Sequence, residues 1–431
     1  MIPVVYNETT NKWQTISKSD DNWYNYNKQK WANVVTVSNY DTYKDTTGVD
    51  IEYSDITTMF VWIPRYVYRI PTENYHQSVT SESLAADTLN NNLVDVHFSK
   101  TEDQGGDFWD KEILVVNAGE TLINSYEAWT TNEAFNFGGT YLNGLWIAKF
   151  QASDPDNQTT TTNVISRLNV TAGKKMQLEA DYVEAFTGCR NMEDKEKSGS
   201  TYSWATSSDM QTNGVFATDT NNLDIHMLKN SEYATFAYFT HSKYGTNKKV
   251  VNGYIEGNGI TYKFYTGSYV TPEGVFRENP SSTSTGNVYG IYDTPSQIWD
   301  MVSAYAGTGQ NYGAGIIYTS DSKYKDVYIS TTETTDYTSK DSVYRIFKDI
   351  KGAAIWETST NGNNSITGWF RGRSNIGVYE GSLYKLFLTR GGTIIENGKM
   401  LASMFSFGYG YAKESTDSRS FRPVIAVGNG L

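Results

Sequence analysis

Three segments near the C-terminus carry the clearest structural pattern in the chain. They are Tyr384-Lys-Leu-Phe-Leu-Thr-Arg-Gly-Gly392, Ala402-Ser-Met-Phe-Ser-Phe-Gly-Tyr-Gly-Tyr411 and Ser420-Phe-Arg-Pro-Val-Ile-Ala-Val427. The apolar run within each segment predicts a buried strand. Two polar connections that contain glycine, 391–401 and 408–419, separate these strands. Because a rigid sheet that presents loops is a common way to build a binding face, we expect a binding surface here.

The bulk composition bounds the possible functions. A chain of 431 residues is long enough for two or three domains with a sizeable core. Its net charge of −12 argues against a protein that mainly binds nucleic acid. Residues 351–431 differ from the rest, since they hold nine basic and five acidic side chains. This basic end favours an anionic glycan or polymer as ligand, and scattered surface charge is the alternative.

Tyrosine is unusually frequent, with 33 residues in the chain. Its ring offers a large, stiff contact area with a polar end, which suits exposed recognition surfaces. The same ring also fills all-β cores and cross-strand pairs. Composition leaves both uses open.

The sequence also indicates where the protein is made. A single cysteine, Cys189, excludes an intramolecular disulfide, and we expect it to be a small core residue. The first residues lack the basic and apolar regions of a secretory signal, and no apolar run reaches the length of a membrane span. We expect a soluble protein, made in a cytoplasm without a signal peptide and not inserted in a membrane. It would leave the cell by lysis or inside a larger particle.

Residues 1–45 are predicted to form a separate module of β-hairpins. The pattern Tyr6-Asn7…Lys12-Trp13 recurs 18 residues later as Tyr24-Asn25…Lys30-Trp31. Each copy is an aromatic run, a polar turn and a tryptophan, which is typical of a hairpin. We expect a small all-β, aromatic-cored sheet that serves attachment or oligomerisation. Residues 46–58 are polar and are interpreted as a linker.

Residues 59–431 are predicted to form one α+β domain with short strands and long loops. Strands are expected over 59–70 and 141–150, and the polar stretch 71–140 between them is interpreted as an insertion. Amphipathic spacing predicts one helix over 176–186 and a second over 224–239. Asn230 or Ser231 is expected to cap the second helix.

Six segments, in this order, resemble formylglycine-generating-enzyme-like (sulfatase-modifying-factor) domains. They are Phe60-Val-Trp-Ile-Pro64; Trp146-Ile-Ala-Lys-Phe150; Met227-Leu-Lys-Asn-Ser-Glu-Tyr-Ala-Thr-Phe-Ala-Tyr238; Gly286-Asn-Val-Tyr-Gly-Ile-Tyr-Asp293 with Ile298-Trp-Asp300; Arg390-Gly-Gly392; and Ser420-Phe-Arg-Pro-Val424. The resemblance covers 59–427 apart from the insertion. It implies a C-type-lectin-like α+β fold with two main helices.

Proteins of this fold include a copper-dependent oxidase, a sulfoxide synthase and non-catalytic ligand-binding proteins. The oxidase needs two cysteines between its closing motifs, whereas residues 393–419 contain none. The synthase holds iron through histidines of an extra domain. Here the four histidines are scattered without metal-ligand spacing, and we interpret His226 and His241 as satisfied structural histidines. The resemblance therefore implies no enzyme activity and no resident cofactor.

Calcium is the one metal that the resemblance leaves open. Related domains often hold calcium near an Asp-x-x-Gly-Asn-x-x-Glu pattern, of which Asp293 and Asp300 remain here. Ser296-Gln297 replaces Gly-Asn, and Pro295 alters the turn. Oxygen ligands for calcium are still present near Asp293. Without the ion, we expect Asp293 to cap a turn and Trp299 to lie in the core.

The predicted ligand-binding surface lies on the C-terminal loops and the segment before them. Tyrosines beside glycine, with asparagine and lysine nearby, have the composition of a paratope, and aromatic rings also stack on sugars. Ordinary loops over a closed core are the alternative. The predicted contact residues are Trp369, Arg371, Arg373, Thr393, Ile395, Asn397, Lys399, Tyr409, Tyr411 and Lys413.

Two further similarities suggest a biological setting. The segments Lys229-Asn-Ser-Glu-Tyr233 and His241-Ser-Lys-Tyr-Gly245 are similar to sequences of Firmicutes and their prophages. The N-terminal repeat resembles modules that precede such domains in prophage structural proteins. We expect a non-enzymatic virion protein of tail-fibre or receptor-binding type that binds a host-surface glycan or protein. It would be a homo-oligomer and contact other virion proteins through residues 1–45. A purely structural capsid or tail decoration protein and a bacterial surface adhesin are the alternatives.

Overall fold

The protein is a mixed α+β structure in which sheets predominate. Within the part of the chain that the structure describes, two helices reach seven residues or more, α3 (Tyr182–Asn191) and α6 (Asn230–Thr240). This confirms the expected α+β class with few helices. The computed structural model describes residues 1–77, 79, 92–99, 129–153, 168–192, 224–248, 250, 266–267, 282–296, 298–306, 314–328, 346–347, 350–359, 367–375, 386–396, 399–413, 416 and 418–426.

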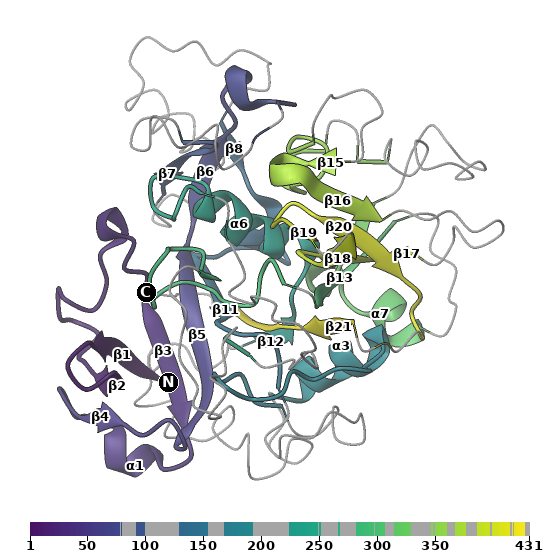
Figure 1. The fold of residues 1–431 in the computed structure, drawn as a ribbon. Helices are drawn as coiled ribbons and strands as arrows, with labels where there is room; N and C mark the ends of the chain where they lie inside the picture. Colours follow the sequence, from purple (N-terminus) through teal and green to yellow (C-terminus); the bar gives the residue numbers. More distant parts are fainter. Residues whose placement is uncertain are drawn as a thin grey trace.

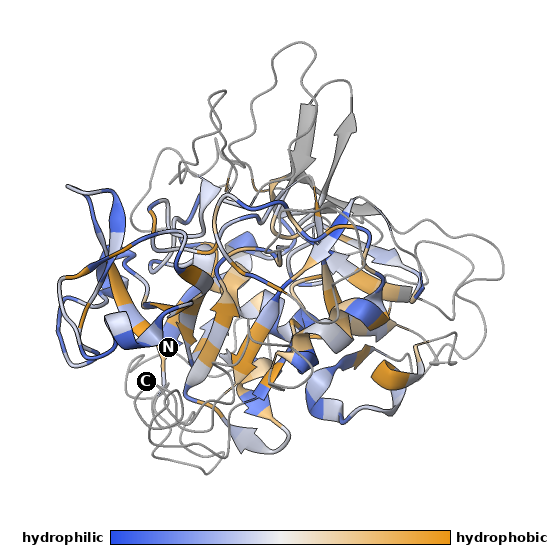
Figure 2. Ribbon diagram, turned by 90° about the horizontal axis from the view of Figure 1, so that it is seen from below, coloured by the Kyte–Doolittle hydropathy of each residue, from blue (hydrophilic) through white to orange (hydrophobic). Residues whose placement is uncertain are grey.

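The largest element is an eight-stranded antiparallel sheet that runs from the N-terminal strands to the centre of Figure 1. Figure 2 shows hydrophobic residues gathered on its central strands, as expected for a sheet that is buried on both faces. In spatial order the strands are β12 (Asp224–Met227), β22 (Pro423–Ala426), β11 (Gly144–Ala148), β5 (Ile56–Pro64), β3 (Asn33–Val37), β1 (Ile2–Asn7), β2 (Lys12–Thr15) and β4 (Asp50–Ile51).

A second sheet of seven strands lies to the right in Figure 1. It mixes parallel and antiparallel pairs, and its long central strand β13 pairs with three neighbours. The strands are β14 (Asp326–Tyr328), β13 (Trp299–Ala306), β17 (Leu386–Arg390), β20 (Phe407–Gly410), β16 (Gly372–Asn375) and β15 (Thr367–Gly368), with β21 (Arg419–Phe421) paired to β13.

Smaller elements surround the two sheets. β6 (Tyr66–Arg69) pairs with β7 (Asp95–Phe98) and β8 (Thr130–Thr131), both from the expected insertion 71–140. The rest are the pairs β9 (Asn136–Phe137) with β10 (Thr140–Tyr141) and β18 (Thr393–Glu396) with β19 (Lys399–Ala402), the helices α1 (Tyr40–Tyr43) and α7 (Gly315–Thr319), and the 3-10 turns η1 (Tyr26–Lys28), η2 (Thr72–Asn74), η3 (Glu133–Phe135), η7 (Ser322–Tyr324) and η8 (Trp369–Arg371).

The N-terminal repeat has a matching backbone geometry in its two copies. Asn7 pairs with Lys12, and Asn25 pairs with Lys30, so the bridges are also 18 residues apart. However, the repeat does not form a sheet of its own. β3 pairs with β5 from Asn33↔Val61 to Val37↔Ile56. Strands from 1–45 and from the expected linker 46–58 are therefore continuous with the main sheet.

The N-terminal tryptophans explain this continuity, because they pack into the body of the protein. Trp23 stacks on Trp146 with ring centroids 6.4 Å apart. Trp31 is fully buried against Phe239 of α6, at 4.8 Å between centroids. Its indole N–H donates to the Tyr244 carbonyl over 2.7 Å. A separate aromatic core would have left these rings facing one another.

We expect Trp31→Ala to lower the free energy of unfolding by about 3–5 kcal/mol, because it leaves a cavity between β3 and α6. Urea unfolding followed by fluorescence and circular dichroism measures the loss. Tyr24→Ala, at a ring that is 41% exposed, is the control and should change stability by about 0.5 kcal/mol or less. A separate early transition in the Trp31 variant would contradict a shared core.

The helices begin later than the sequence pattern indicates. The first starts at Tyr182 because the Asp181 side chain accepts the N–H groups of Val183 and Glu184, each at 2.8 Å. In the second, residues 224–227 leave the expected helix and form β12, which pairs with β22. The start of α6 is capped from a distance, since Ser231 N–H donates to Asp326 of β14 over 2.6 Å.

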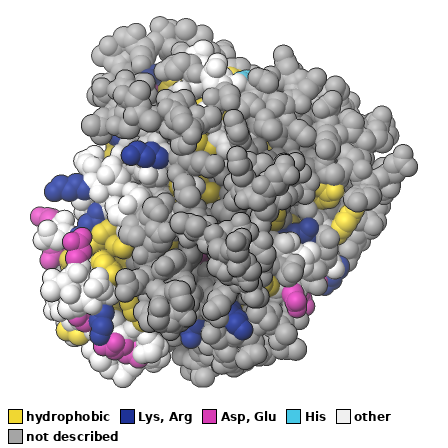
Figure 3. All heavy atoms as spheres, in the orientation of Figure 1, with side chains coloured by type: hydrophobic (Ala, Val, Ile, Leu, Met, Phe, Trp, Pro, Cys, Tyr) yellow, Lys and Arg dark blue, Asp and Glu magenta, His cyan; other side chains and the backbone are white. Residues whose placement is uncertain are grey.

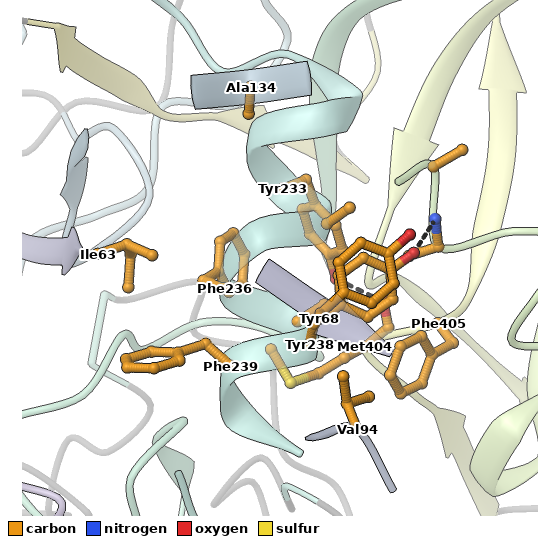
Figure 4. Close-up of a cluster of buried hydrophobic side chains, with 14 of the residues drawn as sticks. Ile63, Tyr68, Val94, Ala134, Tyr233, Phe236, Tyr238, Phe239, Met404 and Phe405 are labelled. Atoms are coloured by element: carbon orange, nitrogen blue, oxygen red, sulfur yellow. Dashed lines mark hydrogen bonds between the residues drawn. The ribbon is translucent and has the colours of Figure 1, made fainter. Parts of the chain in front are cut away.

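Helix α6 is buried on every side, and all its residues are inaccessible. Figure 4 shows Tyr233, Phe236 and Phe239 spaced along it, with Met404 and Phe405 facing from the C-terminal part of the chain. Tyr68 and Tyr238 stack with centroids 4.4 Å apart. Both hydroxyls donate to the buried carboxylate of Glu357. Burial raises the pKa of Glu357, and the donors oppose that effect.

The last two described strands, which follow one another directly, lie in different sheets. β21 pairs with β13 in the second sheet, and β22 pairs with β11 in the first. Arg422 lies at the crossing and is fully buried. Its Nε donates to Asp300 Oδ1 over 3.0 Å, and an Nη donates to Thr294 Oγ1 over 2.7 Å. Burial raises the pKa of Asp300, and the guanidinium opposes that effect.

We expect Arg422→Met to lower the free energy of unfolding by about 3–5 kcal/mol, because it leaves the Asp300 carboxylate buried without its cation. Lys12→Met is the matched control. Lys12 pairs with Glu52 at the surface, and loss of such a pair changes stability by about 0–1 kcal/mol. Urea unfolding of both variants measures the two losses in free energy of unfolding. If Arg422→Met loses no more than Lys12→Met, the buried pair is dispensable for stability.

The surface over the N-terminal strands carries both signs of charge. Figure 3 shows basic and acidic side chains interspersed at the left of the molecule. Lys12 pairs there with Glu52, and Lys44 pairs with Asp41. These described residues therefore form no basic face of the kind that binds nucleic acid.

Candidate binding surface

The three expected C-terminal strands occur as β17, β20 and β22. Met404 and Phe405 lie in the turn before β20 rather than in the strand. β17 and β20 pair with each other, whereas β22 belongs to the other sheet. The connection 391–401, expected as a loop, contains most of the hairpin of β18 and β19, which pair from Thr393↔Ala402 to Glu396↔Lys399.

The two ends of this hairpin are tied together. Gly391 N–H donates to the Ser406 carbonyl over 3.0 Å, which joins the residue before β18 to the turn after β19. Tyr233 of α6 donates its hydroxyl to the Met404 carbonyl over 2.8 Å. Among the described strands, β18 and β19 pair only with each other. The hairpin is therefore presented as a unit from a fixed base.

The two glycines before β18 permit this closure. Gly391 has φ +63°, and a Cβ there would lie 2.7 Å from the Tyr233 hydroxyl. A Cβ on Gly392 would lie 2.0 Å from the Trp299 ring. Trp299 is buried, as expected for a core residue. The Arg-Gly-Gly motif thus lets the chain pass over a core indole.

Arg390, the residue before Gly391, anchors the base of the hairpin to the core. Its buried guanidinium donates to the Ala354 carbonyl over 2.8 Å and to Asn230 Oδ1 over 3.2 Å. It also lies 4.8 Å above the Tyr233 ring. Burial lowers the pKa of Arg390. The side chain connects β17, the first turn of α6 and the segment around residue 354.

We expect Gly392→Ala to destabilise the protein by about 3 kcal/mol, because the methyl group overlaps Trp299 in a packed site. Gly139→Ala is the control. It has φ +89° with open space around it, so it should lose only about 1 kcal/mol from backbone strain. Thermal unfolding of both variants measures the difference. If both variants lose the same stability, the close approach of Gly392 to Trp299 does not constrain this position.

Three of the predicted contact residues come together at the other end of β20, where Gly410 pairs with Phe387. Tyr409 and Tyr411 are half-buried, and their rings meet edge to face at 6.4 Å. Lys413 is exposed and pairs with Asp181 at the start of α3 over 3.1 Å. The Ala412 carbonyl accepts the Tyr182 N–H over 3.2 Å. The segment that follows β20 is therefore docked on α3 rather than projecting freely.

Trp369 does not belong to this surface. The structure places its ring in the core, edge to face with Phe405 at 5.0 Å. Its carbonyl accepts the Ser403 hydroxyl over 2.8 Å. The expectation of an exposed rim residue is therefore wrong at this position. Glycine next to it suggested a loop, but Gly368 instead allows the backbone to approach Phe405 closely.

The backbones of the remaining predicted residues lie close to one another. β16 pairs with β20, and β19 lies against β16 and η8. Residues as far apart in sequence as Ser374 and Phe407 are therefore backbone neighbours. Arg371 ends η8, Arg373 lies in β16, Thr393 and Ile395 lie in β18, Lys399 lies in β19, and Asn397 lies outside the described residues.

The expected calcium position contains carboxylates that already receive N–H donors. Asp293 accepts the Gly267 N–H over 2.7 Å and the Gln151 N–H over 3.2 Å, one at each carboxylate oxygen. Burial raises the pKa of Asp293 to about 6. In the described ranges, no cluster of three His, Cys, Asp or Glu side chains could hold a metal ion. This donor set does not fit calcium, and Asp293 caps main-chain groups instead.

Cys189 and the two histidines near α6 are all buried. Cys189 is a core residue, as expected, and burial raises the pKa of its thiol. His241 lies between Phe370 and Phe405, and burial lowers its pKa to about 3. Its Nδ1 has no hydrogen-bond partner among the described residues, so the expectation of a satisfied histidine is wrong for that atom. His226 contacts two carboxylates.

Sequence reasoning missed the charged groups around His226. It placed Asp224 and His226 in a helix, where alternate residues point in different directions. The alternation Asp-Ile-His-Met is also a strand signal, and the strand places both polar side chains on one face.

No protein-family model matches the chain, and no curated protein matches it. Within the described ranges, no helix has the length and apolarity needed to cross a membrane.

Proposed function

We propose that the chain is a non-enzymatic virion protein of a phage or prophage, of tail-fibre or receptor-binding type. Its C-terminal region, with a C-type-lectin-like fold, binds a glycan or protein on the host surface. The contact surface consists of the β18–β19 hairpin, the neighbouring β16 and the segment from Tyr409 to Lys413. The protein acts as part of an extracellular particle after lysis and needs no cofactor.

The mutual contacts of the six family-like segments support the proposed fold. Strands β5, β11 and β22 carry the first, second and last of these segments and lie side by side. Arg422 of the last segment binds Asp300 of the fourth. Asp300 pairs with Arg390 of the fifth, and Arg390 donates to Asn230 of the third. Segments that resemble one family in order also assemble around one another.

The observation that carries the functional proposal is the closed base of the hairpin. The bond from Gly391 N–H to Ser406 O closes the segment 392–405, which contains the β18–β19 hairpin. The backbone of β18 and β19 therefore pairs with neither main sheet, which suits a segment that contacts a ligand. Binding residues commonly lie on such segments, held by a rigid scaffold.

The described side chains toward the far end of β20 and just beyond it suit sugar or peptide contacts. Tyr409 and Tyr411 offer stiff aromatic area with hydroxyl groups that bind polar ligands. Lys413 adds an exposed cation. Single-site affinity of such a surface is modest, and many copies on one particle raise the overall avidity. This favours a homo-oligomeric attachment protein.

Residues 1–45 are proposed to contact other virion proteins. Because β3 is paired with β5, this contact would use β2 near the outer edge of the main sheet, beside the edge strand β4, rather than a detachable module. A truncation at residue 45 would expose β5 and is unsuitable as a test of attachment. Substitutions at exposed side chains, such as Tyr24 and Val49, leave the sheet intact.

We expect the double variant Tyr409→Ala, Tyr411→Ala to weaken ligand binding by about 30-fold or more, because aromatic anchors dominate interface energies. Binding of the purified full chain to a panel of bacterial surfaces and glycans identifies the ligand and measures the effect. The matched control is Tyr24→Ala, Tyr141→Ala, which removes two rings that are 41% and 38% exposed elsewhere on the molecule.

Unchanged binding by the Tyr409, Tyr411 variant would place the ligand elsewhere. Failure of the folded, oligomeric chain to bind any member of the panel would favour a purely structural capsid or tail decoration protein. Binding to the producing bacterium alone would favour a surface adhesin.

A further inference from the structure

His226 is a fully buried histidine whose two ring nitrogens both face carboxylates. Nε2 lies 2.8 Å from Glu232 Oε1, and Nδ1 lies 3.2 Å from Asp224 Oδ1. Glu232 belongs to α6, and Asp224 belongs to β12, so the ring connects the helix to the edge of the main sheet.

The two contacts define the charge of the ring. An ionised carboxylate only accepts hydrogen bonds, and a neutral imidazole has a proton on one nitrogen only. Both contacts are hydrogen bonds at once only if both nitrogens carry protons. His226 is then an imidazolium between two anions.

The network extends from His226 to the surface through Asp224. Arg190 of α3 binds Asp224 Oδ1 over 2.7 Å, and Lys323 of η7 lies 3.2 Å from Oδ2. The Tyr324 hydroxyl donates to the same Oδ2 over 2.6 Å. A single carboxylate therefore joins α3 and η7 to β12, and its other charged partner is His226.

The remaining sides of the ring and of Glu232 are also occupied. Phe137 stacks on the imidazole at 5.0 Å, and the Tyr324 ring lies at 5.8 Å. Lys229 Nζ lies 3.6 Å from Glu232 Oε1, and the Lys229 N–H donates to Oε2 over 2.8 Å. Asp326 is the further anion at this end of α6, where it accepts the Ser231 N–H.

We propose that His226 is a pH-sensitive lock, in which the charged imidazolium holds β12, α3, α6 and η7 together and its deprotonation loosens this corner of the fold. When one proton leaves, one nitrogen presents a lone pair to a carboxylate. The shorter contact to Glu232 is retained, and Asp224 is repelled toward Arg190 and Lys323. The segments β12 and η7, which Asp224 joins to each other, thereby lose their shared link through the imidazole to Glu232 of α6.

The direction of the pH effect follows from the charges. Burial lowers the pKa of His226, but the carboxylates of Glu232 and Asp224 outweigh it and hold the pKa above its usual value. Burial raises the pKa of both carboxyl groups, but His226 and nearby cations outweigh it and hold both pKa values below their usual range. The lock is complete above the usual carboxyl pKa of about 4. It is lost as pH rises through the raised pKa of His226.

His241, at the other end of the same helix, provides an internal control. It is equally buried but lies between two aromatic rings, and no described carboxylate contacts it. Burial lowers its pKa to about 3, so it is neutral wherever the lock operates. The two histidines differ in environment rather than in exposure.

The test is a pH titration of the full chain with its histidines labelled with ¹⁵N. Between pH 5 and 6, close to the usual histidine pKa of about 6.5, we expect one buried histidine to show two protonated ring nitrogens and another to be neutral. His226→Asn should remove the charged signal, and His241→Asn should remove the neutral one. A His226 that is neutral at pH 5 would overturn the proposal.

Hydrogen exchange measures the consequence in the unmodified protein. As pH rises through the His226 titration, and after correction for intrinsic exchange rates, amides of 224–227 and 322–328 should lose protection. Amides of β13 should not. Thermal unfolding supplies a second measurement. The melting temperature of the wild type should fall as pH rises through the His226 titration. The His226→Asn variant should melt at a lower temperature and should not show this fall, whereas His241→Asn should still show it. If the melting temperatures of wild type and His226→Asn change with pH in parallel, the proposal is overturned, even if the variant is less stable at every pH.

Discussion

The buried pair of Arg422 and Asp300 is the constraint on which the two-sheet arrangement depends. Strands β21 and β22 are separated by one residue, and they belong to different sheets. Arg422 is that residue, and its side chain turns inward to a carboxylate on the central strand of the second sheet. A buried guanidinium has a large desolvation penalty unless its donors find acceptors. Satisfying those donors therefore fixes how the sheets meet.

The same place in the fold positions the candidate binding surface. Asp300 pairs in register with Arg390, and the next two residues pass over Trp299. The base of the β18–β19 hairpin is thus assembled from the strand that carries the buried pair. Contacts of Gly391, Gly392 and Ser406, which lie outside β18 and β19, thus fix the ends of the hairpin.

The protein buries several charged groups, and each has a different set of partners. The Lys149 ammonium donates to Asn33 Oδ1 and to the carbonyls of Val288 and Gly290, and it lies near the Trp13 ring. Main-chain oxygens thus hold the cation and join β3 to the segment around residue 289. Glu357 receives tyrosine hydroxyls instead. These polar contacts specify which segments meet, a choice that nonspecific apolar packing leaves open.

The sequence by itself determined the elements that depend on local pattern. Alternation and apolar runs predicted strands β5, β11, β17 and β22, and the 18-residue repeat predicted the N-terminal turns. Cysteine and histidine content argued against the metal chemistry of the enzymes whose motifs the sequence resembles. Only the tertiary structure decided which segments pair with, pack against or cap one another. It joined residues 1–45 to the main sheet, placed Trp369 in the core and brought Asp326 to cap α6. Periodicity reports the type and burial of an element, whereas pairing and capping by distant residues depend on the whole fold.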